Sequence, residues 1–594
     1  LWERTHYNGF GQQTIAGLVR GDRRSTSVPN DNNLSTGGGN GFASFLLGEA
    51  YSGGTENERF VGQQWRSHAF YFQDDWKVTR RLTLNLGLRY EFTLPPLEQK
   101  DKWSDFTPDR PNPRADNIPG ALRFAGFGPG RENSRTLVDG WWGGWGPRLG
   151  LAYSLNDRTV IRAAGARTFG IVKTTTGSTH FDGAVLIYRP ESLDNGITPA
   201  FKMDDGLPPY QKPPVIDPSF ANGQSPAYWD NDAVRMPQNY QWTFSIQRQL
   251  GSSFVAEAAY NATMGSNLVA GLKNINQLPF SVLEKYGRTL LSSSIDSPAA
   301  VAAGLKRPYT NIDCDFSRTC QPVSVAQTLR PFPQYNQINT WAGLGDKSGH
   351  STYHSMVLKL EKRFSEGWTF TGSYVLSKLL TDADSYDADN RAADHYNRRL
   401  EKSIGQYDQT HIFKFSYVYE LPFGRGKRWL NSGIASSVLG NWRISGFHNY
   451  ASGFPLPLTN STNYLIFNGR SPAHVTTYEG WVANHDNPNW RGGDRYFNPP
   501  STFAGEQPDT ILGNATRFNP KARYPWLLDE SFSIAKSFFF TESIRMDFRW
   551  ELFNAFNRSR FSPGNTNVQA PDFGQVTNTI NDPRRMQVGL KLYW

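Results

Sequence analysis

The sequence predicts an all-β chain that forms an antiparallel transmembrane β-barrel. Three observations lead to this prediction. Segments in which apolar and polar residues alternate recur along the chain, and aromatic residues make up 14% of it. The connections between these segments are alternately short and long. Strands of this period, aromatic girdles and short turns opposite long loops are together typical of outer-membrane barrels.

The composition excludes several other classes of protein. The chain has 594 residues, of which 38% are hydrophobic and 19% are charged, and it contains 55 Gly and 37 Pro. Disordered chains are depleted in aromatic residues, so this chain is not one of them. No run of about 18 apolar residues is present, which argues against membrane-spanning helices. The net charge of +9 comes without a long Lys/Arg run, so we expect no nucleic-acid partner.

The clearest strand covers residues 82–92. Leu82, Leu84, Leu86 and Leu88 fall on one face, and polar residues such as Asn85 fall on the other. Strict alternation of this kind is a strand signal. A tilted strand that spans a membrane needs about 9–11 residues, and this segment is long enough.

The segment 545–553 separates its two faces more sharply. Its apolar face consists of Met546, Phe548, Trp550 and Leu552, and its charged face consists of Arg545, Asp547, Arg549 and Glu551. Four charges on one face exclude the core of a β-sandwich and favour the lumen wall of a barrel. We expect these charges to pair across strands, although they could instead line the path of a substrate.

We expect fourteen strands in all, an even number as in bacterial barrels. They lie near residues 10–20, 66–78, 81–92, 146–156, 159–169, 238–250, 254–262, 351–364, 368–380, 409–421, 441–454, 527–538, 542–554 and 584–594. The connections at 79–80, 156–158, 251–253, 365–367 and 539–541 are short, and the one at 422–440 is longer. The long loops are 21–65, 93–145, 170–237, 263–350, 381–408, 455–526 and 555–583. In such a barrel the short turns are periplasmic and the long loops are extracellular.

Four segments resemble a known family. They are FASFLLGEA (42–50), FYFQDDWKVTRRLTLNLGLRYEF (70–92), SIRMDFRWELFNAFNRSRF (543–561) and RRMQVGLKLYW (584–594). Together they look like TonB-dependent outer-membrane receptors, and in particular the Oar-like branch, whose members often carry an N-terminal carboxypeptidase-regulatory-like domain. The resemblance runs from about residue 10 to residue 594.

The resemblance implies more than this sequence contains. The family's barrel has about 22 strands and encloses a plug, preceded by a short box that contacts TonB. We therefore expect residues 1–594 to be the C-terminal part of the barrel, with the plug, the regulatory-like domain and a signal peptide absent. The resemblance also implies that the last strand is an assembly signal for the barrel-insertion machinery, carried by Gln587, Gly589, Leu590, Leu592 and Trp594. Outer-membrane lipid is the implied surrounding.

Two segments are candidate binding sites. The acidic segment 381–390 holds Asp382, Asp384, Asp387 and Asp389, whose carboxylates could bind Ca²⁺. The segment lacks the Gly and distal Glu of an EF-hand, and a solvated acidic loop is the competing interpretation. Trp141, Trp142 and Trp145 could stack on a flat ligand, or they could belong to the interfacial girdle.

Cys314 and Cys320 suggest one small disulfide-closed loop, and a two-thiol metal site is the alternative. No catalytic motif is present, so we expect neither an enzyme nor a cofactor.

The resemblance favours the barrel of a TonB-dependent transporter that captures a substrate at its long loops. The substrate is not named by the sequence, because one scaffold hosts many ligands. A passive channel or an adhesion barrel shares every strand feature, and a soluble carbohydrate-binding β-protein is a third possibility.

Overall fold

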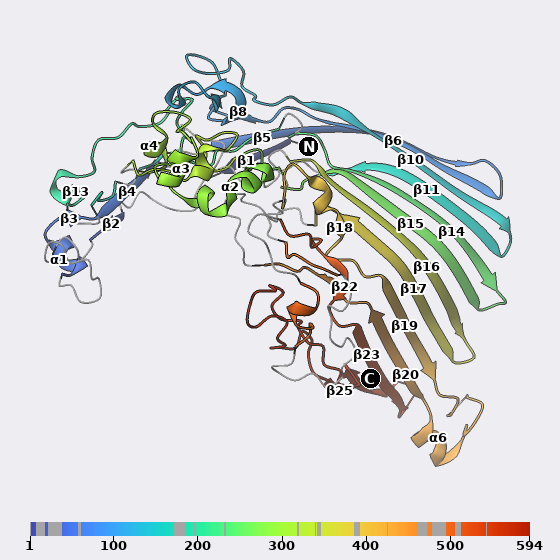
Figure 1. The fold of residues 1–594 in the computed structure, drawn as a ribbon. Coiled ribbons are helices and arrows are strands. Elements are labelled where there is room, and N and C mark those ends of the chain that lie inside the picture. Colours follow the sequence, from blue (N-terminus) through green and yellow to red (C-terminus); the bar gives the residue numbers. More distant parts are fainter. Residues whose placement is uncertain are drawn as a thin grey trace.

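A computed structural model gives the arrangement of most of the chain (Figure 1). The described residues are 2–7, 18–21, 26, 39–57, 61–170, 186–188, 190–194, 198–230, 233–271, 273–317, 320–338, 340, 346–384, 392–424, 426–460, 472–477, 495–504, 512–541 and 543–594.

One antiparallel sheet of sixteen strands, curved as Figure 1 shows, dominates the structure. We call the long path through it the wall. Its strands are β1 (Trp2–Tyr7), β5 (Val61–Lys77), β6 (Leu82–Thr93), β10 (Trp141–Asn156), β11 (Thr159–Phe169), β14 (Gln238–Leu250), β15 (Phe254–Leu268), β16 (Gly349–Ser365), β17 (Trp368–Thr381), β19 (His411–Glu420), β20 (Trp442–Ala451), β23 (Leu527–Phe539), β24 (Arg545–Phe553) and β25 (Arg585–Tyr593). The predicted all-β, antiparallel class is confirmed, and every predicted strand from residue 66 onward coincides with a wall strand.

The first predicted strand, at 10–20, is not among the described wall strands. Residues 10–17 lie outside the described residues, and Leu18–Arg20 form β2, which pairs with β4 (Ser52–Asn57) away from the wall. The first wall strand is β1, whose Trp2 lies opposite Arg66. β5 begins at Val61, earlier than predicted, and this added length gives β1 its partner.

The two ends of the wall differ. At one end the turns are short, as between β16 and β17, where Ser365 lies opposite Trp368. The two residues between them, Glu366 and Gly367, have φ of 56° and 83°. Positive φ at both central residues is what a tight hairpin turn of this hand requires, and Gly adopts it without strain. We call this the short-turn end and the other the long-loop end.

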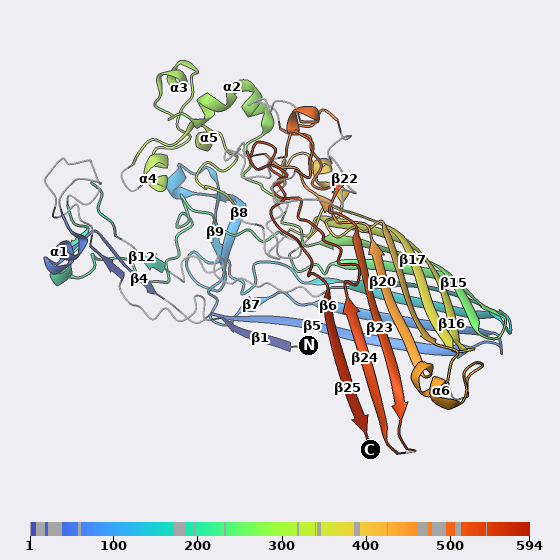
Figure 2. The same ribbon diagram turned by 90° about the horizontal axis from the view of Figure 1, so that it is seen from below.

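A folded region projects from the long-loop end, as Figure 2 shows. We call it the cap and define it as the described residues of 99–140, 203–237 and 269–348. Within it lie β8 (Ser104–Pro111), β9 (Pro119–Phe124), η2 (Pro113–Ala115), η4 (Met203–Asp205), α2 (Phe280–Ser292), α3 (Pro298–Ala302), α4 (Ile312–Phe316) and α5 (Val325–Thr328). The cap encloses apolar cores around Leu283 and Ile312, and around Phe106 and Tyr335. A third core joins the cap to the wall, because Trp229 packs on Trp103 of the cap and Trp65 of β5.

A second group of loops packs separately, around Tyr496, Phe503 and Phe573. The remaining elements are α1 (Gly41–Leu46), β3 (Glu49–Ala50), β7 (Leu97–Glu98), β12 (Leu186–Tyr188), β13 (Phe201–Lys202), η5 (Arg398–Glu401), β18 (Ser403–Ile404), α6 (Gly433–Leu439), β21 (Pro455–Leu456), η6 (Pro500–Thr502) and β22 (Asn519–Arg523). Within the described residues, no helix is long and apolar enough to cross a membrane.

Candidate functional site

The wall has one apolar and one polar face, because directly paired residues of an antiparallel sheet share a face. Leu86 lies opposite Leu149, and Leu84 lies opposite Leu151. Leu149 is 62% exposed, so the protein itself leaves this apolar face uncovered. On the other face, Asn85 donates a hydrogen bond to Asp75 at 2.6 Å.

The four predicted wall charges lie together on β24, but their ion pairs join residues two apart on this same strand. Arg545 pairs with Asp547 at 3.3 Å, and Arg549 pairs with Glu551 at 3.4 Å. The contacts across strands are made by uncharged residues: the Ser537 hydroxyl donates to Asp547 at 2.7 Å, and Gln587 donates to Glu551. The printed register places Lys591 of β25 opposite Asp547, but the ion pairs of the four charges join residues two apart on β24 and do not cross strands as expected.

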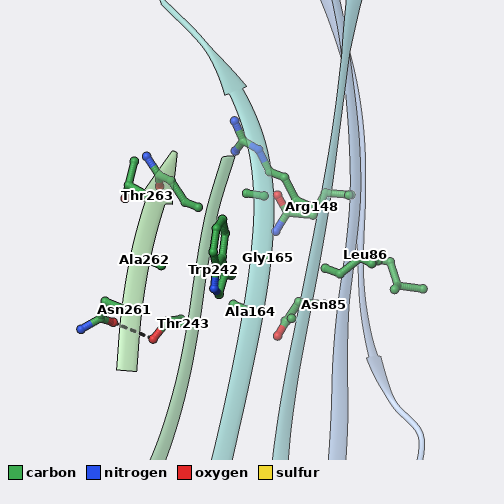
Figure 3. Close-up of a pocket in the computed structure, with 16 residues that line it drawn as sticks. Asn85, Leu86, Arg148, Ala164, Gly165, Trp242, Thr243, Asn261, Ala262 and Thr263 are labelled. Atoms are coloured by element: carbon green, nitrogen blue, oxygen red, sulfur yellow. Dashed lines mark hydrogen bonds between the residues drawn. The ribbon is translucent and has the colours of Figure 1, made fainter. Parts of the chain in front are cut away.

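A hollow of about 500 Å³ lies against six neighbouring strands, β5, β6, β10, β11, β14 and β15 (Figure 3). Gly150 and Gly165 carry no side chain there, which thins the wall locally. Side chains from both faces border the hollow, Trp242 from the apolar face and Asn261 from the polar face. Asn261 accepts a hydrogen bond of 2.7 Å from Thr243, drawn dashed in Figure 3.

The three candidate tryptophans do not form one surface. A register shift between Trp141 and Gly144 separates them. Trp141 turns toward the cap core and packs edge-on against Phe169. Trp142 stacks on Phe92 with ring centroids 4.7 Å apart, and Trp145 lies 4.2 Å from Tyr90. The last two are 55% and 52% exposed at the long-loop end of the apolar face, the place of an interfacial girdle.

The acidic segment 381–390 is only partly described, and Asp387 and Asp389 lie outside the described residues. Asp384 pairs with Arg517 at 2.7 Å, and burial raises the pKa of this carboxyl group. Asp382 accepts a hydrogen bond from the backbone of His350 at 2.6 Å and lies 3.8 Å from Arg398. Each of the two described carboxylates thus has an arginine of the chain as an ion partner. Among the described residues, no cluster of three potential metal ligands occurs.

The cap contains a buried ion pair that sequence reasoning missed. Arg123 on β9 donates to both carboxylate oxygens of Asp105 on β8, at 2.6 and 2.9 Å. Asp105 is 1% exposed, and burial raises the pKa of its carboxyl group to about 6, against the effect of Arg123. Strand alternation in Ser104–Pro111 was the available signal, but nothing local marks Arg123 as the partner.

Polar groups join distant parts of the cap. Buried Asn112 donates to Asn222 at 2.7 Å and accepts from Ser219 at 2.7 Å. Cys314 of α4 forms a disulfide with Cys320, with an S–S distance of 2.07 Å. Asp315 of α4 pairs with Arg114 at 2.6 Å. These contacts hold the cap in one arrangement.

Another buried carboxylate lies on the apolar face of the wall. Glu530 of β23 is 0% exposed and pairs with Arg558 at 3.2 Å. Phe556 packs edge-on against Phe532, so the segment after β24 folds back over the outer side of the wall. This pair also escaped sequence reasoning, because its two residues meet only in the folded structure.

The strand proposed as an assembly signal is β25, at one edge of the wall. Leu590 and Leu592 lie on the apolar face opposite Phe548 and Met546, and both are more than half exposed. Gln587 and Gly589 lie on the polar face. Trp594 is 88% exposed.

The chain was compared with curated proteins and with solved structures. No curated protein matches the sequence. Solved structures with a similar fold include the pyoverdine outer-membrane receptor FpvA of Pseudomonas aeruginosa PAO1 (10% identity, TM-score 0.36, covering 90% of this chain and 43% of that one). A second is the ferric-catecholate import receptor Fiu of Escherichia coli K12 (10% identity, TM-score 0.36, covering 90% of this chain and 46% of that one). A third is the outer-membrane transporter YddB of Escherichia coli (9% identity, TM-score 0.37, covering 89% of this chain and 54% of that one). The chain spans about half the length of these proteins.

The family comparison covers nearly the whole chain. Residues 2–587 match the model described as outer membrane beta barrel domain. The apolar outer face, the polar inner face and the unequal ends are what such a barrel requires. The chain therefore belongs to the outer membrane β-barrel domain family and lies in the bacterial outer membrane.

Proposed function

We propose that this chain is the barrel wall and extracellular cap of a TonB-dependent transporter of the Oar-like branch. The observation that carries the proposal is the folded cap at the long-loop end of a wall with one polar face; this end would be extracellular. The cap would capture a substrate, and the polar inner face would let it pass. Energy would arrive through TonB and a plug encoded outside the residues described.

Two features of the sequence and structure support this assignment. The segments 70–92 and 543–561, on which the family resemblance rests, form the hairpin β5–β6 and the strand β24 with its following turn. The inner-face charges of β24 are neutralised within the chain, so a passing substrate would not meet uncompensated charge. The last strand, β25, would present Leu590, Leu592 and Trp594 to the barrel-insertion machinery.

The test uses the full-length native protein purified from outer membranes. We expect a mass well above the 66.9 kDa of this chain, with upstream peptides that correspond to a plug. We also expect cross-linking to the periplasmic domain of TonB and no steady ion conductance in a planar bilayer. A mature protein of 66.9 kDa that conducts ions and ignores TonB would contradict the proposal and favour a passive channel.

A further inference from the structure

The connection between β19 and β20 differs from the other turns at the short-turn end of the wall, which is the periplasmic end of such a barrel. It contains α6 (Gly433–Leu439), a helix of seven residues. Its apolar side chains are exposed: Ile434 by 85%, Val438 by 59% and the preceding Trp429 by 52%. Only Ser436 of the helix is buried. Exposed apolar residues grouped in this way mark a surface that contacts something other than water.

Hydrogen bonds fix the side of the wall on which α6 lies. The Lys536 ammonium group donates to the carbonyls of Ser437, Val438 and Gly440 at 2.9, 2.6 and 3.1 Å. Trp442 donates its indole N–H to the carbonyl of Val438 at 3.1 Å. Lys536 and Trp442 lie opposite each other in register, and Lys536 shares the apolar face with Ile534. The end of α6 is thus attached to the lipid-facing side of the wall.

The level of α6 along the barrel follows from its neighbours. Figure 1 shows α6 at the far end of β19 and β20 from the cap. Trp442 and Trp368 lie at this same end, where aromatic residues mark the boundary between lipid tails and headgroups. Arg428 lies over the ring of Trp429 at 5.5 Å, which adds a cation to the exposed apolar group. Cations and aromatic rings together suit the zone of lipid phosphates.

We propose that α6, with Trp429 and Leu430, is an in-plane anchor inserted into the phospholipid of the periplasmic leaflet. Its apolar side continues the lipid-facing surface of the wall past the last residues of β19 and β20. Helices of this kind bury their apolar side about 5–10 Å into the headgroup boundary. The anchor is independent of transport, because it requires only that the wall lies in the outer membrane.

The experiment places an environment-sensitive fluorophore on the helix. An Ile434→Cys variant of the full chain is labelled with NBD and reconstituted into vesicles of phosphatidylethanolamine and phosphatidylglycerol that contain spin-labelled phosphatidylcholine. We expect blue-shifted emission and quenching several-fold stronger than at a matched control, Ser252→Cys. Ser252 is an exposed residue of the short turn between β14 and β15. Retained β-structure by circular dichroism shows that both variants fold.

Two results would overturn the anchor. Emission typical of water at position 434, equal to that at position 252, would place α6 in the periplasm. Blue-shifted emission without quenching by spin-labelled lipid would mean that protein covers the helix. Val438→Cys repeats the measurement on the same side of α6 and decides the matter if the Ile434 variant fails to fold.

Discussion

The wall and the cap of this protein place their apolar residues in opposite ways. In the wall, Leu149 and Leu590 point outward and are 62% and 68% exposed. In the cap, Phe106, Leu122 and Leu283 are fully buried. The difference shows that one chain folds against two solvents. The wall turns apolar groups toward lipid, whereas the cap must hide them from water.

Charges follow the same division. The cap buries the pair formed by Asp105 and Arg123, whereas Arg549 of the wall is exposed beside Glu551. Removing one partner of a buried ion pair lowers the stability of the fold strongly, because the remaining charge has no water to solvate it. Removing one partner of an exposed ion pair lowers the stability only slightly. Substitutions in the two regions should therefore differ in cost.

The largest effect is expected from Arg123→Met in the cap. It leaves the Asp105 carboxylate buried without its partner, which costs about 3–5 kcal/mol. Hydrogen exchange of β8 and β9 should accelerate while β15 to β17 stay protected. The matched control is Arg549→Met on the exposed face of β24, for which we expect less than about 1 kcal/mol. An equal loss of stability in the two variants would contradict the claim that the cap depends on its buried ion pair more than the wall depends on its exposed one.

The next effect concerns the lipid-facing side of the wall. Leu86→Arg should cost about 2–4 kcal/mol if residue 86 lies near the middle of the membrane, because lipid does not solvate the guanidinium group. Asn85→Arg, one residue away on the polar face, is the control and should cost far less. A folding titration in lipid vesicles measures both. Indistinguishable titrations would contradict the assignment of the two faces.

The smallest effect is a dependence of cap stability on pH. Burial raises the pKa of Asp105 from 3.8 to about 6, so the folded cap binds more protons than the unfolded cap between these values. Stability therefore falls as the pH rises from 3.8 toward 6, by roughly 1–3 kcal/mol, and stays at the lower level above that window.

The exchange of β8 and β9 amides at several pH values, corrected for the intrinsic exchange rate, reports this change. Asp105→Asn should remove most of the dependence. A cap that becomes more stable as the pH rises through this window would contradict the sign of the shift.

Local pattern predicted most of the wall. The bounds predicted for β14, at 238–250, agree with the structure, and Leu82 to Leu88 share the apolar face as expected. The period of a strand is a property of consecutive residues, so alternation reveals it without knowledge of the rest of the chain. The exception was β1 (Trp2–Tyr7), a wall strand that alternation did not predict.

Local pattern did not predict the fold of the cap or the helix α6. The sequence marked 93–145 and 263–350 as long loops, but it did not show that Asn112 would meet the Tyr335 hydroxyl, 223 residues away. A contact at that separation depends on how several loops close over one another, which no short window contains.

The sequence by itself determined the all-β class, the two faces of the wall and the unequal lengths of its connections, because each follows from neighbouring residues. Only the tertiary structure decided that Trp141 would turn inward while Trp142 and Trp145 turn outward, since a register shift separates them. It also decided that Asp384 would meet Arg517 and that Lys536 would hold α6 against the outer side of the wall. Those outcomes depend on side chains from segments far apart in the chain, which meet only when the strands have paired.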